Sequence, residues 1–129
     1  TREKVNYAID MAKLFGAVVH IFSVLETDDE FLVNKLERQL QQVKQFITES
    51  GVECQGELVP QSDSNVSLSI IEYARIKNCD LIIIMTQGET NIADLFIGTA
   101  AQEVINNSEI PVLCIRPMVR KDTTQYVLS

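Results

Sequence analysis

The sequence is poor in several residue types on which common protein classes depend. Across 129 residues, Lys and Arg number 11 against 18 Asp and Glu, which leaves a formal net charge of -7. An acidic chain does not hold the phosphate backbone of a nucleic acid by bulk electrostatics, so we expect no nucleic-acid partner. No apolar run approaches the roughly 20 residues that a membrane-spanning helix needs. The opening residues contain no apolar signal segment either, so we expect no membrane partner.

Cysteine and histidine are also scarce. The three cysteines, Cys54, Cys79 and Cys114, are spread along the chain without a Cys-x-x-Cys pair. This pattern favours small buried apolar residues in a reducing, cytoplasmic compartment over a disulfide framework or a zinc site. His20 is the single histidine, and no nucleophile signature lies near it. We therefore expect a packed strand histidine rather than a catalytic base, and no metal site.

Helical and strand-like segments alternate along the chain. Apolar residues at steps of three and four indicate helices, and nearly continuous β-branched apolar runs indicate strands. The expected helices are 2–15, 29–49, about 62–78 and 92–107, and the expected strands are 17–25, 52–60, 80–85 and 111–116. This alternation predicts right-handed crossovers and a three-layer α/β/α fold with a parallel sheet. We expect one domain over residues 1–117 and a polar tail over 118–129.

Several local signals refine these expectations. Asp28, Asp29 and Glu30 supply an N-cap and negative charge for the long second helix, while Gly16 and Gly51 are natural helix stops. The run 81–85 has no polar residue and predicts the centre of a parallel sheet, and strand 17–25 predicts burial on both faces. One apolar stripe is expected to bury the second helix: Phe31, Leu32, Leu36, Leu40, Val43, Phe46 and Ile47.

The loop after the strand 80–85 carries the clearest binding signal. Gly88 follows a buried strand, and Gly98 and Thr99 come at the start of a helical stretch. Such a pair offers free main-chain N–H groups, a hydroxyl and the positive end of a helix dipole, which together suit a phosphate. By spacing alone, a turn followed by close helix packing is the simpler interpretation.

The wider stretch resembles the universal stress protein family. That family's signature is a strand, Gly-x-x-Gly, nine residues, Gly-Ser or Gly-Thr, a helix and a Pro-Val-Leu strand. Here Gly88, the nine residues 89–97, Gly98 and Thr99 match in register, and the strand from Pro111 to Arg116 follows. The resemblance extends to Phe15-Gly16-Ala17, to the strand from His20 to Val24 and to the third helix, which is nearly the whole chain.

The resemblance implies a five-stranded parallel sheet in the order 3-2-1-4-5, dimerisation, a role in stress response and, in some members, ATP binding. Carried over by position, Gly88, Gly98 and Thr99 would contact phosphates and Ala100 would add an N–H group. The backbone of Val24 would meet the adenine. Mg²⁺ would accompany ATP, with Asp94 and Glu103 beside the motif, although ordinary solvent exposure is the simpler expectation for both carboxylates.

Two features depart from the family pattern. Met85 stands where the first glycine of Gly-x-x-Gly is expected, and Gln87 replaces a cation before the second. A methionine there adds a Cβ and a long side chain, which weakens nucleotide binding without abolishing it. The family's first, central strand has no counterpart in this sequence. A sheet lacking it would contain a gap with two unpaired inner edges. We therefore expect either that such a strand precedes Thr1 in the protein or that something else fills the slot.

Two hypotheses for function remain open. In the first, the chain binds an adenine nucleotide and acts through dimerisation or partner contact. In the second, the pocket is empty and the chain is an interaction module, forming a homodimer or a tandem-domain dimer through the strand from Val112 to Arg116. No P-loop motif and no general base with an evident partner occurs, so we expect no catalytic residues and no enzyme; a slow ATPase is the weakest alternative.

Overall fold

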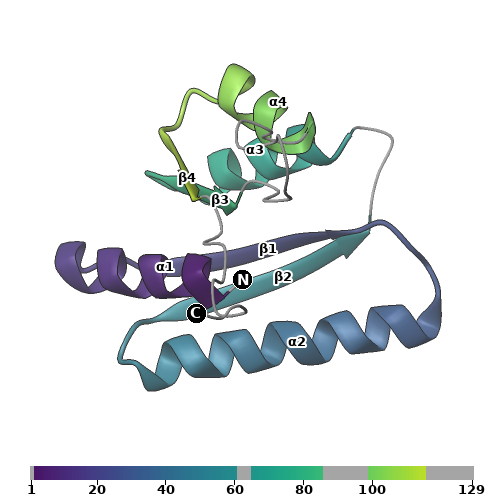
Figure 1. Ribbon diagram of the computed structural model, residues 1–129, viewed down its shortest axis with the longest axis horizontal. Helices are drawn as coiled ribbons and strands as arrows, with labels where there is room; N and C mark the ends of the chain where they lie inside the picture. Colours follow the sequence, from purple (N-terminus) through teal and green to yellow (C-terminus); the bar gives the residue numbers. More distant parts are fainter. Residues whose placement is uncertain (1, 61–64, 86–98, 116–129) are drawn as a thin grey trace, which may run out of the picture.

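The computed structural model describes residues 2–60, 65–85 and 99–115 (Figure 1). Helices and strands alternate throughout this part of the chain, as the sequence predicts. The elements are α1 (Arg2–Phe15), β1 (Val19–Leu25), α2 (Glu30–Glu49), β2 (Cys54–Pro60), α3 (Val66–Ile76), β3 (Ile82–Met85), α4 (Thr99–Asn107) and β4 (Val112–Ile115). The tail 118–129 and residues 92–98 of the expected fourth helix lie outside the described residues.

Local hydrogen bonds explain where the helices begin and end. The Oδ1 of Asp29 accepts the N–H groups of Phe31 at 2.9 Å and Leu32 at 3.3 Å, so Asp29 is the N-cap of α2. Gly16 and Gly51, which follow α1 and α2, have φ values of 64° and 90°, a backbone conformation that favours glycine. For α3 the N-cap is Asn65, whose Oδ1 accepts the N–H of Leu68 at 2.9 Å.

The four strands form two separate parallel pairs. β1 pairs with β2, with Val19 opposite Cys54, and β3 pairs with β4, with Ile82 opposite Val112. No pairing joins β1 to β3 among the described residues. The described strands therefore leave a gap between β1 and β3, as predicted from the absence of the family's first strand. The expectation that 81–85 lies at a sheet centre is wrong here, because β3 has a hydrogen-bonded neighbour on one side only.

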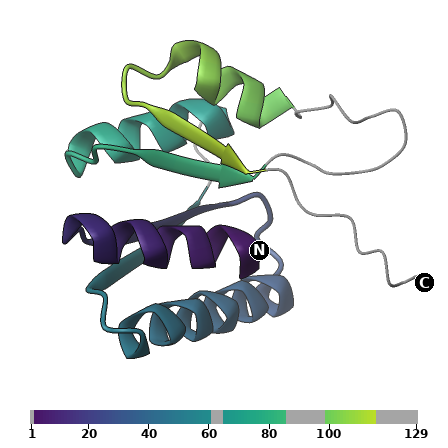
Figure 2. The ribbon, with the colours of Figure 1, turned by 60° about the vertical axis from the view of Figure 1, so that its left-hand side comes forward.

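Helices cover both faces of the strands, in the three-layer arrangement that the sequence predicts. α1 and α2 lie on one side and α3 and α4 on the other (Figures 1 and 2). Each side has its own small core. Ile9, Ala12, Ile47, Val52 and Cys54 form the core of the α1–α2 side. Ala74, Ile82 and Val104 form the core of the α3–α4 side.

Several apolar residues expected in the core are exposed. Phe15 at the end of α1 is 69% exposed and Phe31 at the start of α2 is 71% exposed, so the stripe on α2 is not buried along its whole length. Most residues of β1 are only half-buried, which corrects the expectation of burial on both faces. Cys54 is buried and Cys79 half-buried, but Cys114 is exposed, so the expectation of three buried cysteines is wrong for Cys114.

Candidate functional site

The carboxyl ends of β3 and β4 and the start of α4 lie on the same side of the molecule (Figure 2). Val24 is the last residue but one of β1, and Met85 ends β3 opposite Ile115. Thr99 and Ala100 open α4. Ligands of open parallel α/β folds bind outside the carboxyl ends of the strands, so this edge is the candidate site. Gly88 and Gly98, the glycines of the predicted site, lie outside the described residues.

The first turn of α4 can bind an anion through its main-chain N–H groups. The opening N–H groups of a helix have no partner within the helix and carry the positive end of its dipole. Ala100 is exposed, so the backbone at this end of α4 is accessible. The chain as a whole is acidic, and these main-chain donors are a local attraction for phosphate that does not depend on net charge.

A polar cluster missed by the sequence reasoning ties α4 to α3. The Oγ of Ser67 lies 2.9 Å from Oε1 of Glu103 and 2.8 Å from Oδ1 of Asn65. Ser67 is only 2% exposed, so the bond from its hydroxyl is shielded from water. Glu103 is half-buried, which corrects the expectation of solvent exposure for this carboxylate. The two side chains are 36 residues apart, and no sequence spacing signals such a contact.

A second feature is a large cavity between the two strand pairs. Its volume is ≈ 910 Å³, and its walls come from α1, α2, β1 and the segment that enters β3. His20 lines it and packs edge-on against Tyr73, which itself stacks on Phe22 at 4.1 Å between ring centroids. His20 is thus a packed strand histidine, as predicted, but its Nδ1 is buried without a hydrogen-bond partner.

Burial changes the titration of groups around this cavity. It lowers the pKa of Lys4, which lines the cavity from α1, because the charged ammonium loses solvation. Burial raises the pKa of Tyr73, and the nearby negative charges of Glu57 and Cys79 raise it further. Burial also raises the pKa of the Cys79 thiol, together with Asp80, while Lys77 acts in the opposite direction.

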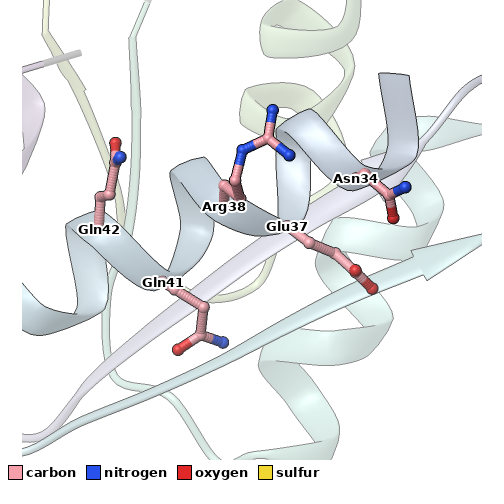
Figure 3. Close-up of a pocket in the computed structure, with 5 residues that line it drawn as sticks. All are labelled: Asn34, Glu37, Arg38, Gln41 and Gln42. Atoms are coloured by element: carbon pink, nitrogen blue, oxygen red, sulfur yellow. The ribbon is translucent and has the colours of Figure 1, made fainter. Parts of the chain in front are cut away.

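A shallower hollow of ≈ 510 Å³ lies on the outer face of α2 (Figure 3). Its lining residues are all exposed and polar, and their side chains diverge rather than converge on one point: Asn34, Glu37, Arg38, Gln41 and Gln42. An open surface with divergent amides and one of each charge does not hold a ligand. This face of α2 is exposed and polar, as is typical of the solvent side of an amphipathic helix.

The model of the universal stress protein family matches residues 2–116. The chain belongs to the universal stress protein family. A universal stress protein of Methanocaldococcus jannaschii is 29% identical over 128 residues, which cover 88% of this chain and 74% of that protein.

Solved structures of universal stress proteins share the fold. One from Archaeoglobus fulgidus superposes with a TM-score of 0.76 at 21% identity, covering 87% of this chain and 86% of the other. A universal stress protein from the same organism in complex with dAMP gives a TM-score of 0.70 at 22% identity, covering 87% and 84%. At these identities the likeness confirms the fold class that the sequence predicts.

No helix in 2–60, 65–85 or 99–115 is long and apolar enough to cross a membrane. No group of three or more His, Cys, Asp or Glu side chains in that part of the chain is placed to hold a metal ion. Of the predicted site residues, Val24 lies near the end of β1, Met85 ends β3, and Thr99 and Ala100 begin α4.

Proposed function

We propose that this universal stress protein binds an adenine nucleotide, ATP with Mg²⁺, at the carboxyl edge of its strands, without turning it over. The observation that carries the proposal is that the N-terminus of α4 lies on the same side of the molecule as the carboxyl ends of β3 and β4 (Figure 2). In the sequence, this helix begins directly after Gly98 of the motif. The complex of a related universal stress protein with dAMP supports the class of ligand.

The residues have distinct proposed roles. The backbone of Val24 meets the adenine base at the end of β1, and the N–H groups of Thr99 and Ala100 meet the phosphates. Gly88 and Gly98 let the backbone approach those phosphates closely. Met85 adds bulk at the end of β3 and weakens the affinity, so we expect a reversible sensor of nucleotide level.

The mode of action is binding rather than catalysis. Neither the described cluster of Ser67 and Glu103 nor His20 supplies a base beside the α4 N-terminus with an activating partner. The bound nucleotide would therefore report its presence through dimerisation or contact with a partner, in a cytoplasmic protein.

Calorimetric titration of the full chain with ATP and Mg²⁺ tests the proposal. We expect one nucleotide to bind per chain. Adenosine, which lacks the phosphates, should bind more weakly than ATP. Tripolyphosphate is the matched probe without a base. Absence of measurable heat at millimolar ATP would overturn the binding proposal.

A second function is favoured by one observation. β4 pairs only with β3 in the described part of the chain, and Cys114 in its middle is exposed, so its outer edge is available for a second copy. The strand proposed for this homodimer or tandem-domain contact runs from Val112 to Arg116, of which Arg116 lies outside the described residues. Light scattering should then give a mass near twice 14.5 kDa. A monomer without nucleotide binding would exclude both functions.

A further inference from the structure

The polar cluster between α3 and α4 contains three oxygen atoms in hydrogen-bond contact. The Oγ of Ser67 lies 2.8 Å from Oδ1 of Asn65 and 2.9 Å from Oε1 of Glu103. Each distance is that of an ordinary O–H···O hydrogen bond, which needs a proton between its two oxygens. A serine hydroxyl supplies only one proton, so a second proton has to come from one of the other two groups.

Asn65 does not supply the second proton. Its Oδ1 also accepts the N–H of Leu68 at 2.9 Å, as the N-cap of α3, which identifies this atom as the amide oxygen rather than the NH₂ group. An amide oxygen has two lone pairs and no proton, so it accepts from Ser67 as well. The hydroxyl proton of Ser67 is therefore used in the bond to Asn65, and the remaining source is the carboxyl group of Glu103.

We propose that this cluster is a proton-binding site, in which Glu103 is protonated and its carboxyl O–H donates to the Oγ of Ser67. Each pair of oxygens then has one proton between them. If Glu103 loses its proton, either a carboxylate oxygen faces the hydroxyl oxygen without a proton between them, or the hydroxyl turns to Glu103 and leaves Asn65. One bond is lost in both cases. Ser67 is only 2% exposed, so water does not replace that bond.

The titratable side chains around Glu103 do not favour its ionised form. Glu103 is the only one on α4, and β3 has none. The others lie on α3, on β4 and in the turns beside them: Glu72, Tyr73, Arg75, Lys77, Cys79, Asp80, Glu109 and Cys114. Glu72 and Arg75 pair with each other at 2.6 Å. Lys77 lies over the ring of Tyr73. Burial raises the pKa of the Cys79 thiol, which therefore stays neutral. Among the described residues, no cation forms an ion pair with Glu103.

The proton couples pH to the position and charge of α4. Glu103 lies one turn beyond Thr99 and Ala100, whose N–H groups are proposed to contact phosphates. With the proton in place, α4 is bonded to α3 and carries no charged side chain. Without it, the contact between the helices is weaker, and a carboxylate competes with phosphate for the positive end of α4. Low pH therefore favours anion binding. This consequence rests on the proposed nucleotide site, whereas the proton on Glu103 does not.

Carbon-13 NMR of the side-chain carboxyl groups in the full chain tests the proton directly. We expect the Glu103 signal, assigned from its backbone resonances, to have the chemical shift of a protonated carboxyl at pH 6. Glutamate side chains of an unfolded chain are ionised at that pH, so the chain unfolded in urea gives the reference for a carboxylate. A Glu103 signal at the carboxylate position in the folded chain would overturn the proposal.

The variant Glu103→Gln tests the same proton through stability. Its amide keeps a donor toward Ser67 and never ionises. The folded wild type binds one more proton than the unfolded chain, so its stability falls as pH rises. Relative to Glu103→Gln, its folding equilibrium constant should fall by up to about tenfold for each pH unit between pH 5 and the pH at which Glu103 releases its proton.

Urea unfolding at pH 5, 6 and 7 measures this difference. Glu109→Gln is the matched control, because Glu109 is exposed and this variant should keep the pH dependence of the wild type. If Glu103→Gln keeps the pH dependence of the wild type and is less stable at every pH, Glu103 is an ionised acceptor and the proposal is wrong. If that variant does not fold, the NMR measurement on the wild type decides.

Calorimetric titration with ATP and Mg²⁺ at pH 5.5 and pH 8 tests the coupling to the nucleotide site. From the lower to the higher pH, the affinity of the wild type should fall at least about threefold more than that of Glu103→Gln, because only the wild type gains a charge near the start of α4. Changes in the charge of ATP affect both proteins equally. Equal pH dependence would contradict the coupling. No binding by either protein would overturn the nucleotide site alone, because NMR and unfolding test the proton separately.

Discussion

Met85 is the residue of the candidate site that departs most from the family signature. It ends β3 at the candidate edge, where the family signature has a glycine. We expect Met85→Gly to tighten ATP binding by about threefold to tenfold, roughly 1 kcal/mol, because the backbone can then approach the ligand. Calorimetry measures the change, and Met85→Leu, which keeps the bulk, is the control. Equal or weaker affinity of the glycine variant would reject the steric explanation.

Ser67 offers a test of buried polar bonding. Its hydroxyl lies between Asn65 and Glu103 and is shielded from water. We expect Ser67→Ala to lower the free energy of unfolding by about 1–3 kcal/mol, because Glu103 loses a partner in a partly buried position. Ser69→Ala, on the same helix and half-buried, is the matched control and should cost less. Urea denaturation measures the free energy of unfolding of both variants. Equal losses of stability would show that the buried hydrogen bond of Ser67 contributes nothing.

The cysteines should differ in reactivity. Cys114 is exposed, whereas burial raises the pKa of both Cys54 and Cys79 and lowers their thiolate fractions at neutral pH. Iodoacetamide at pH 7.5 should therefore modify Cys114 first, and the other two should catch up only as pH rises. Peptide mass spectrometry gives the order. If β4 forms a dimer contact, labelling of Cys114 should also slow as the protein concentration rises. Labelling of Cys54 before Cys114 would contradict the burial of Cys54.

At the scale of elements, the helix ends were predictable where a local signal exists. Asp29, Gly16 and Gly51 act within one or two residues of the helix ends, so their roles can be inferred from the sequence. The exposure of Phe15 and Phe31 could not be inferred, because periodicity reports a face and not whether anything covers it. The Ser67–Glu103 bond and the unpartnered Nδ1 of His20 depend on contacts between distant segments, which no local pattern encodes.

The N-cap of α2 gives a prediction at this scale. Asp29→Ala removes the acceptor for two N–H groups and should lower the free energy of unfolding by about 1 kcal/mol. Asp28→Ala removes a neighbouring exposed carboxylate that accepts no bond among the described residues, and it should cost much less. Denaturant titration compares the two variants. A larger loss for Asp28→Ala would mean that charge near the helix start, and not the cap bond, stabilises α2.

At the scale of the whole molecule, the alternation of segments was sufficient to predict the α/β fold, and the family match confirms it. The missing family strand predicted the gap that divides the described strands into two pairs. The alternation of segments could not show that each side of the strands has its own small core. Contact between the halves runs through helices and aromatic rings, as where Tyr73 of α3 stacks on Phe22 of β1. The proposed nucleotide site would join the same halves, because Val24 belongs to one strand pair and Met85 to the other.

Residue-resolved NMR titration with ATP and Mg²⁺ tests this bridging edge most directly. We expect the amide signals of Val24 in β1 and of Thr99 and Ala100 in α4 to shift together and to saturate with one affinity, since one ligand contacts both halves. Signals of the outer face of α2, such as Gln41 and Gln42, should stay unchanged. Shifts confined to one half, or no shifts at millimolar ATP, would contradict nucleotide binding at this edge.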